Sequence, residues 1–283
     1  MKKLCIALLA AVLLIFPAAC SDKTDNGGVD ASSAISAPSS AAQDGMALYK
    51  AGAEKIDAAM REGSLKYQYT SNVAFTSAGV TQNMGISGDM VMSWKDGLQI
   101  SMTTDMTMGS SDTVIQSALY SDGKTIYSSA MGQTVKQTLD QATTTQLEER
   151  IFGQAGTAAN LENASVLEQT VTEEAEGGYT VTLTLDPASL SDVSGLLDGV
   201  TDMAQVEYQI NTMTLTAKLD QTGMLTSVEA DADLDMTQNG QEINVGVRYS
   251  TSYSDVGGDF TITPPDSIDM ENAVETESIF GEA

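Results

Sequence analysis

The chain has 283 residues, a formal net charge of −26 at pH 7 and no histidine. A surface this acidic repels nucleic acid, because neither partner can release counterions to a molecule of the same sign, so no nucleic-acid partner is expected. The missing histidine removes the commonest general base and transition-metal ligand, which excludes Ser–His–Asp, Cys–His and histidine-based zinc chemistry.

Residues 1–19 have the pattern of a secretory signal peptide. Two lysines precede an apolar run over residues 4–16, and two alanines stand directly before Cys20. This order matches a charged n-region, an h-region and a small-residue cleavage site. A cysteine directly after such a site resembles the lipobox of bacterial lipoproteins, although that family usually has leucine where this chain has Pro17. The resemblance implies cleavage before Cys20 and acylation of its thiol, for example with palmitate.

A lipid anchor would place the protein at the cell membrane, on the extracytoplasmic face, with the membrane as its partner through the acylated N-terminus. No second apolar stretch approaches the ~20 residues that a membrane helix needs. Cys5 would leave with the signal peptide, so the folded body would contain no cysteine for a disulfide or thiolate site.

Residues 20–45 are predicted to be the lipidated cysteine followed by a flexible tether. Serine, alanine, glycine and aspartate dominate this segment, and no apolar period is present. Such a chain of 25 residues spans roughly 25–30 Å on average.

A single domain over residues 46–269 is expected to begin with a helix. Its apolar residues recur at steps of three and four, which is typical of an amphipathic helix that ends at Gly63. These residues are Met46, Tyr49, Ala53, Ile56 and Met60.

From Lys66 the apolar period changes to two, which is typical of half-buried strands. One strand carries Tyr67, Tyr69, Val73 and Phe75. The next two carry Met84, Ile86, Met90, Met92 and Trp94, and then Leu98, Ile100, Met102, Met106 and Met108. Glycine-containing segments at 95–97 and 121–124 predict hairpin turns, and shorter strands are expected around 114–120, 124–131 and 134–139.

The middle of the domain interrupts this alternation. Leu147 and Ile151 suggest a short helix, after which strands resume at 165–172 and 179–185. Pro187 is well placed in the first turn of a second helix. The apolar side of that helix would be Leu190, Val193, Leu196, Leu197 and Val200.

The last third reads as a meander of strands at 213–219, 228–236 and 243–253, with turns at 220–223 and 239–240. Phe260 and Ile262 are predicted to add a last short strand. Residues 270–283 are acidic and aperiodic, and they are predicted to be a disordered tail.

These elements predict an α+β fold that is mostly β. Strands that are apolar on one face need a cover, and about three helices are available to cover about ten strands. The sheet is therefore expected to be large, antiparallel and strongly curved, a half-barrel wrapped around a few helices.

The chain resembles the LolA/LolB-like and LppX/LprG-like lipoproteins over residues 46–269. The resemblance rests on the helix before the first strand, the hairpins YSDGKTIY at 120–127 and LDQTGML at 219–225, and ITPP at 262–265. It implies a space between sheet and helices that can hold acyl chains. No functional residue transfers one for one.

The apolar face is rich in methionine, a soft side chain that fills adaptable apolar surfaces. It forms a hypothetical ligand-binding site, and the alternative is that these side chains only pack the core. The candidate residues are Met84, Met90, Met92, Trp94, Met102 and Met106.

Two further patterns have a structural and a functional interpretation. Glu229, Asp231, Asp233 and Asp235 approach a calcium-loop pattern, but Met236 stands where the loop needs glycine, so a solvated strand face is expected and no metal site. The second pattern is a group of four tyrosines: Tyr67, Tyr69, Tyr249 and Tyr253. They could form an aromatic ledge for glycans or other ligands, or they could simply pack against one another across strands.

The sequence predicts a monomeric, lipid-anchored surface lipoprotein without catalysis or cofactor. It would bind a hydrophobic or amphipathic, lipid-like ligand between sheet and helices. The alternative is a structural or interaction module that presents an acidic sheet surface to a protein, an envelope polymer or a cation.

Overall fold

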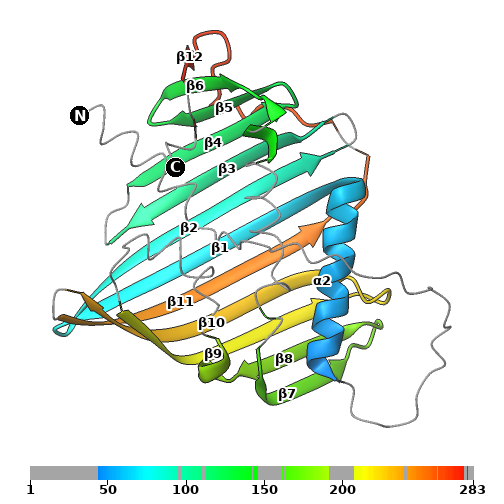
Figure 1. Cartoon of the computed structure of the whole chain (residues 1–283), viewed down its shortest axis with the longest axis vertical. Coiled ribbons are helices and arrows are strands. Elements are labelled where there is room, and N and C mark those ends of the chain that lie inside the picture. Colours follow the sequence, from blue (N-terminus) through cyan, green and yellow to red (C-terminus); the bar gives the residue numbers. More distant parts are fainter. Residues whose placement is uncertain are drawn as a thin grey trace.

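The computed structural model describes residues 44–94, 97–109, 113–141, 143–145, 161, 164–190, 207–238, 241–259, 261–276 and 279. The described strands form a 12-stranded sheet in the order β12-β6-β5-β4-β3-β2-β1-β11-β10-β9-β8-β7. Neighbouring strands are antiparallel, except that β12 runs parallel to β6. The large curved sheet and its mostly β composition confirm the predicted fold class (Figure 1).

The first half of the sheet comprises β1 (Ser64–Ser77), β2 (Val80–Ser93), β3 (Gln99–Met108), β4 (Val114–Asp122), β5 (Thr125–Ala130) and β6 (Gln133–Thr138). The second half comprises β7 (Val166–Glu173), β8 (Tyr179–Leu185), β9 (Glu207–Leu219), β10 (Leu225–Gln238) and β11 (Gln241–Ser254), and the short β12 (Val274–Glu275) lies at the far edge. Pairing of β1 with β11 joins the two halves.

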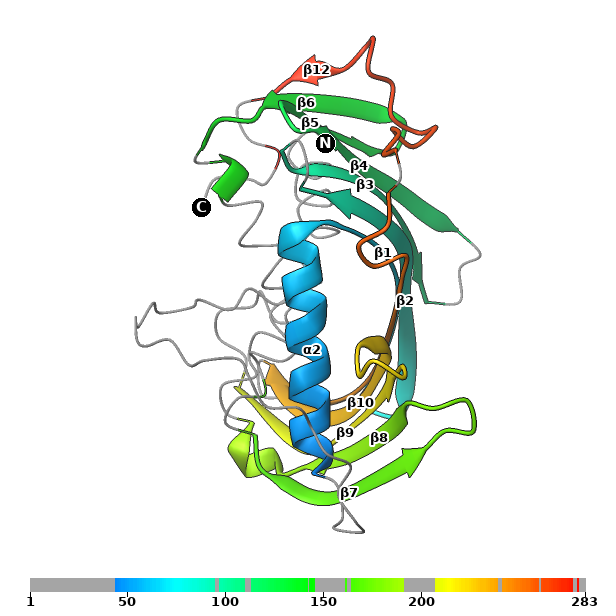
Figure 2. The same ribbon diagram turned by 90° about the vertical axis from the view of Figure 1, so that its right-hand side faces the viewer.

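The sheet curves around helix α2 (Gly45–Glu62), which crosses the concave side at the end where β1 begins (Figures 1 and 2). The Asp44 side chain caps the helix by accepting hydrogen bonds from the backbone N–H groups of Met46 and Ala47 at 3.1 and 3.3 Å. The predicted helix is confirmed, and Gly63 is its C-cap, with a φ of −153° that is not left-handed.

Alternation along each strand divides the sheet into two faces. In β1, Tyr67, Tyr69 and Val73 are buried on the concave face, whereas Gln68 and Thr70 are exposed on the convex face.

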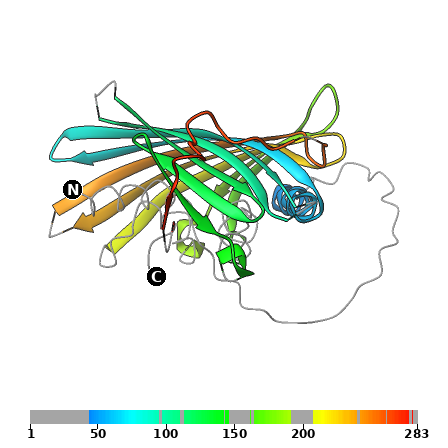
Figure 3. The same cartoon turned by 90° about the horizontal axis from the view of Figure 1, so that it is seen from above.

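Seen from above, α2 lies against one end of the curved sheet (Figure 3). None of the described helices is long and apolar enough to cross a membrane.

The predicted last strand is wrong at Ile262. This residue lies in a coil segment and packs with Ala118, Tyr120 and Ile268 on the convex face of the sheet. The sequence could not distinguish a strand from such a covering segment, because both carry apolar side chains that pack against the sheet. Phe260 lies outside the described residues.

The prediction of a disordered tail over 270–283 is wrong for part of the segment. Val274 and Glu275 form β12, which pairs with Val135 and Lys136 of β6. Ile279 is buried in the main core.

Several predictions fall outside the described residues. These are the signal peptide, Cys20, most of the tether, the helix near Leu147, and the tips of the turns at 95–97 and 239–240. Of the predicted second helix, the structure describes a single turn, η2 (Pro187–Ser189), capped by the Asp186 side chain, and the buried Leu190.

Candidate ligand-binding site

The concave face gathers the predicted methionines into one apolar surface. Met90, Met92, Met102 and Met106 are buried in the main core, and Met84 and Trp94 are partly buried against it. The strand register sets Met90 opposite Met102 on the neighbouring strand. The structure thus brings all six candidate residues to one cluster, whereas their role in ligand binding stays a prediction.

Exposure of this surface rises along the strands away from α2. In β2 the exposed fraction grows from 1% at Met92 to 63% at Val80, which lies on the same face by alternation. In β3, on the same face, it stays at 8% or below from Ile100 to Met106 and reaches 54% at Met108. The apolar surface is therefore closed at the end near α2 and open to solvent at the other end.

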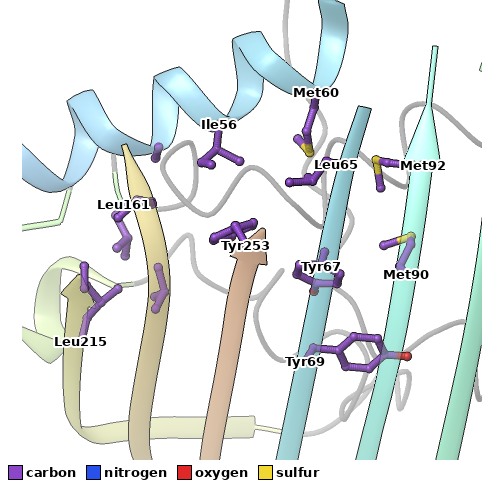
Figure 4. Close-up of a cluster of buried hydrophobic side chains, with 14 of the residues drawn as sticks. Ile56, Met60, Leu65, Tyr67, Tyr69, Met90, Met92, Leu161, Leu215 and Tyr253 are labelled. Carbon is purple, nitrogen blue, oxygen red and sulfur yellow. The ribbon is translucent and has the colours of Figure 1, made fainter. Parts of the chain in front are cut away.

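Helix α2 closes its end of the face by packing against β1 and β7–β10. Ile56 and Met60 point from the helix toward Leu65 and Tyr253, as Figure 4 shows. All four side chains are buried.

Tyrosines from β1 and β11 meet in the middle of the concave face. The hydroxyls of Tyr67 and Tyr249 share a hydrogen bond of 2.8 Å. The ring of Tyr67 stacks on Tyr69, with centroids 5.5 Å apart, and tilts against Tyr253 at 5.8 Å. The structure thus joins the predicted aromatic residues by cross-strand packing.

Tyr69 reaches across a whole strand, because Gly88 leaves room beneath its ring. The Tyr69 side chain extends over β2 (Figure 4), and its hydroxyl shares a 2.6 Å hydrogen bond with Thr104 Oγ1 on β3. A Cβ on Gly88 would lie 2.6 Å from the tyrosine Cζ and hydroxyl. The glycine is therefore required for this contact.

Burial keeps these phenols uncharged. It raises the pKa of Tyr69 to about 12, although the hydrogen bond from Thr104 acts in the opposite direction. Burial also raises the pKa of Tyr67 and of Tyr249. The same surroundings disfavour any other anion.

Residues 52–273 match the model of DUF6612, described as a family of unknown function. The chain belongs to the DUF6612 family. No curated protein matches this DUF6612 chain.

Three solved structures are similar to the DUF6612 chain. LprF from Mycobacterium bovis is 12% identical, covers 79% of this chain and 97% of its own, and has a TM-score of 0.38. A DUF1329 protein from Desulfovibrio piger is 9% identical, with 78% and 96% coverage and a TM-score of 0.25. A DUF1849 protein from Brucella abortus is 14% identical, with 68% and 98% coverage and a TM-score of 0.21. Membership of the LolA/LolB-like and LppX/LprG-like group stays a prediction.

The acidic residues of β10 in this DUF6612 protein lie on the convex face, where Glu229, Asp231 and Asp235 are exposed and Asp233 is half-buried. Asn211 and Asn244 donate hydrogen bonds to Asp233 and Asp235 at 2.8–3.2 Å. Arg248 Nε contacts Asp231 Oδ1 at 2.7 Å. Among the described residues, no group of acidic, histidine or cysteine side chains is arranged to hold a metal ion.

Sequence reasoning missed the polar residues in the middle of the concave face. Gly88 and Thr104 stand where the methionine alternation of β2 and β3 is interrupted, and the register places them opposite one another. Thr251 lies opposite Tyr69 on the other side. The interruption of the apolar alternation at Gly88 in β2 and at Thr104 in β3 was the sequence signal that could have located these residues.

Proposed function

We propose that this DUF6612 protein is a lipid-anchored lipoprotein of the cell envelope that binds a lipid-like ligand on the concave face of its sheet. One observation carries the proposal: the apolar side chains of the concave face are buried near α2 and become exposed at Val80 and Met108. A surface of this kind accommodates acyl chains, because methionine side chains adapt their shape at low cost.

The proposed role is binding without catalysis. The chain contains no histidine, and its two cysteines are Cys5 in the predicted signal peptide and Cys20 at the predicted lipidation site. Ligand capture on an apolar surface needs neither a nucleophile nor a general base.

Native mass spectrometry tests ligand binding directly. The chain from residue 20 on, carrying Cys20→Ser so that it stays unacylated, is purified without detergent and measured before and after organic extraction. We expect an additional mass in the lipid range that extraction removes. A bare polypeptide mass, together with no uptake of added oleoyl lipids, would contradict the proposal.

The anchor is tested by the same substitution in cells. Cys20→Ser is expected to move the protein from the membrane fraction to the soluble extracytoplasmic fraction, because no acyl chain can then be attached. Immunoblots of fractionated cells measure the shift, and Cys5→Ser is the matched control that should stay in the membrane fraction. Equal membrane association of both variants would show that another feature holds the protein there.

A second candidate function uses the convex face. Asn211 and Asn244 hold Asp233 and Asp235 in a fixed arrangement, which would suit a basic partner segment. A bare polypeptide mass combined with salt-sensitive binding of a lysine-rich peptide, lost in Asp233→Asn, would favour this function.

A further inference from the structure

The middle of the concave face contains a cluster of hydroxyl groups. We define this hydroxyl cluster as Tyr67, Tyr69, Thr104, Tyr249 and Thr251. Its residues come from β1, β3 and β11, and apolar side chains such as Met90 and Met106 lie on both sides of it along the strands.

The hydroxyl cluster has unused hydrogen-bonding capacity. Thr251 is 1% exposed, and against the larger, raising effect of burial, a hydrogen bond from its hydroxyl lowers the pKa of Tyr249. The hydroxyls of Tyr67, Tyr249 and Thr251 carry three O–H donors, and the two bonds among them leave one donor unused. Buried hydroxyls without partners are unfavourable, so an additional oxygen from a ligand would be stabilised here.

The described core provides hydroxyls but no charge. Every buried polar residue among the described residues is a serine or a threonine. The nearest sheet cations in sequence point elsewhere, since Lys66 pairs with Asp255 and the exposed Arg248 pairs with Asp231. A carboxylate or phosphate placed in the cluster would therefore meet donors without a counter-charge, and burying an uncompensated charge is costly.

We infer that the hydroxyl cluster binds an uncharged oxygen of the ligand, such as an ester carbonyl or an alcohol, and selects neutral acyl compounds over anionic ones. This inference rests on the proposed function, and it names the chemical class of the ligand. The acyl chain would lie along the methionines, with the oxygen at Tyr249 and Thr251.

A matched series of C18 probes tests the inference. Methyl oleate has an uncharged ester, oleate has a carboxylate at pH 8.5, and 1-octadecene has no oxygen. Each displaces the neutral fluorescent probe N-phenyl-1-naphthylamine from the unacylated chain beginning at residue 20. We expect methyl oleate to bind at least tenfold more tightly than either of the other two.

Variants locate the preference in the cluster. The double variant Tyr249→Phe, Thr251→Val keeps the shape of the cluster and removes two hydroxyls. Its preference for methyl oleate over 1-octadecene should fall below about threefold, because a hydrogen bond to the ester contributes roughly 1 kcal/mol. Thr216→Val on β9, whose hydroxyl bonds to Thr182 on the convex face, is the matched control and should keep the preference.

The binding results distinguish failure of this inference from failure of the proposed function. Equal or tighter binding of oleate, or equal binding of 1-octadecene, would overturn the inference and leave the proposed function standing. Failure of all three probes, with no lipid bound to the purified chain, would overturn both. The parent chain alone separates these outcomes, so a variant that does not fold leaves the test intact.

Discussion

Gly88→Ala is expected to lower the free energy of unfolding by about 3 kcal/mol. The added Cβ would lie 2.3 Å from the backbone oxygen of Thr103, which the β2–β3 pairing holds in place. It would also lie 2.6 Å from Cζ and the hydroxyl of Tyr69, so the tyrosine would lose its contact with Thr104. Both the sheet and the hydroxyl cluster would be distorted.

Urea unfolding followed by circular dichroism measures this loss. Gly246→Ala on β11 is the matched control, because a Cβ there meets nothing within 4 Å and the backbone φ is not left-handed. The control should be neutral or more stable by up to about 1 kcal/mol, since alanine restricts the unfolded chain. Similar losses in both variants would show that the close approach at Gly88 is not the cause.

Stability is expected to fall steeply as pH rises from 10 to 12. The pKa of Tyr69 is raised from 10.0 to about 12 in the folded chain, chiefly by burial. The stability that the buried Tyr69 phenol contributes is complete below pH 10, where the phenol is protonated in both the folded and the unfolded chain. Between pH 10 and 12 this stability is lost, because the phenol ionises in the unfolded chain alone. Two pKa units correspond to about 2.7 kcal/mol, and Tyr67 and Tyr249 act in the same direction.

Urea unfolding at steps between pH 8 and 12, with tyrosinate absorbance at each step, tests this expectation. The Cys20→Ser background removes thiolate absorbance. Tyr69→Phe should show a smaller loss over the same range, and the difference between the two curves isolates Tyr69 from the general repulsion of an acidic chain. Ionisation of every tyrosine near pH 10 without loss of structure would contradict the buried cluster.

Local features of the sequence predicted most of the individual elements. Turns such as 220–223 are determined by one short segment, in which Asp220 Oδ1 accepts hydrogen bonds from the backbone N–H groups of Thr222 and Met224. The amphipathic period similarly located α2, and alternation located the long strands. These features depend on residues a few positions apart, which the sequence shows directly.

Covering segments and edge pairing were harder to predict. Ile262 has the apolar character of a strand residue, yet it lies in a coil that packs on the convex face. The pairing of β12 with β6 joins Val274 to Val135. Neither contact has a local signature, because the partner lies in another part of the chain.

The sequence by itself determined the acidity of the chain, its lack of histidine and the apolar alternation of its strands. Only the tertiary structure decided that Tyr67 meets Tyr249, 182 positions away, and that Tyr69 crosses Gly88 to reach Thr104. Alternation places each side chain on one of two faces, but the register between strands distant in sequence decides which side chains meet. The hydroxyl cluster exists because the pairing of β1 with β11 and with β2 fixes that register.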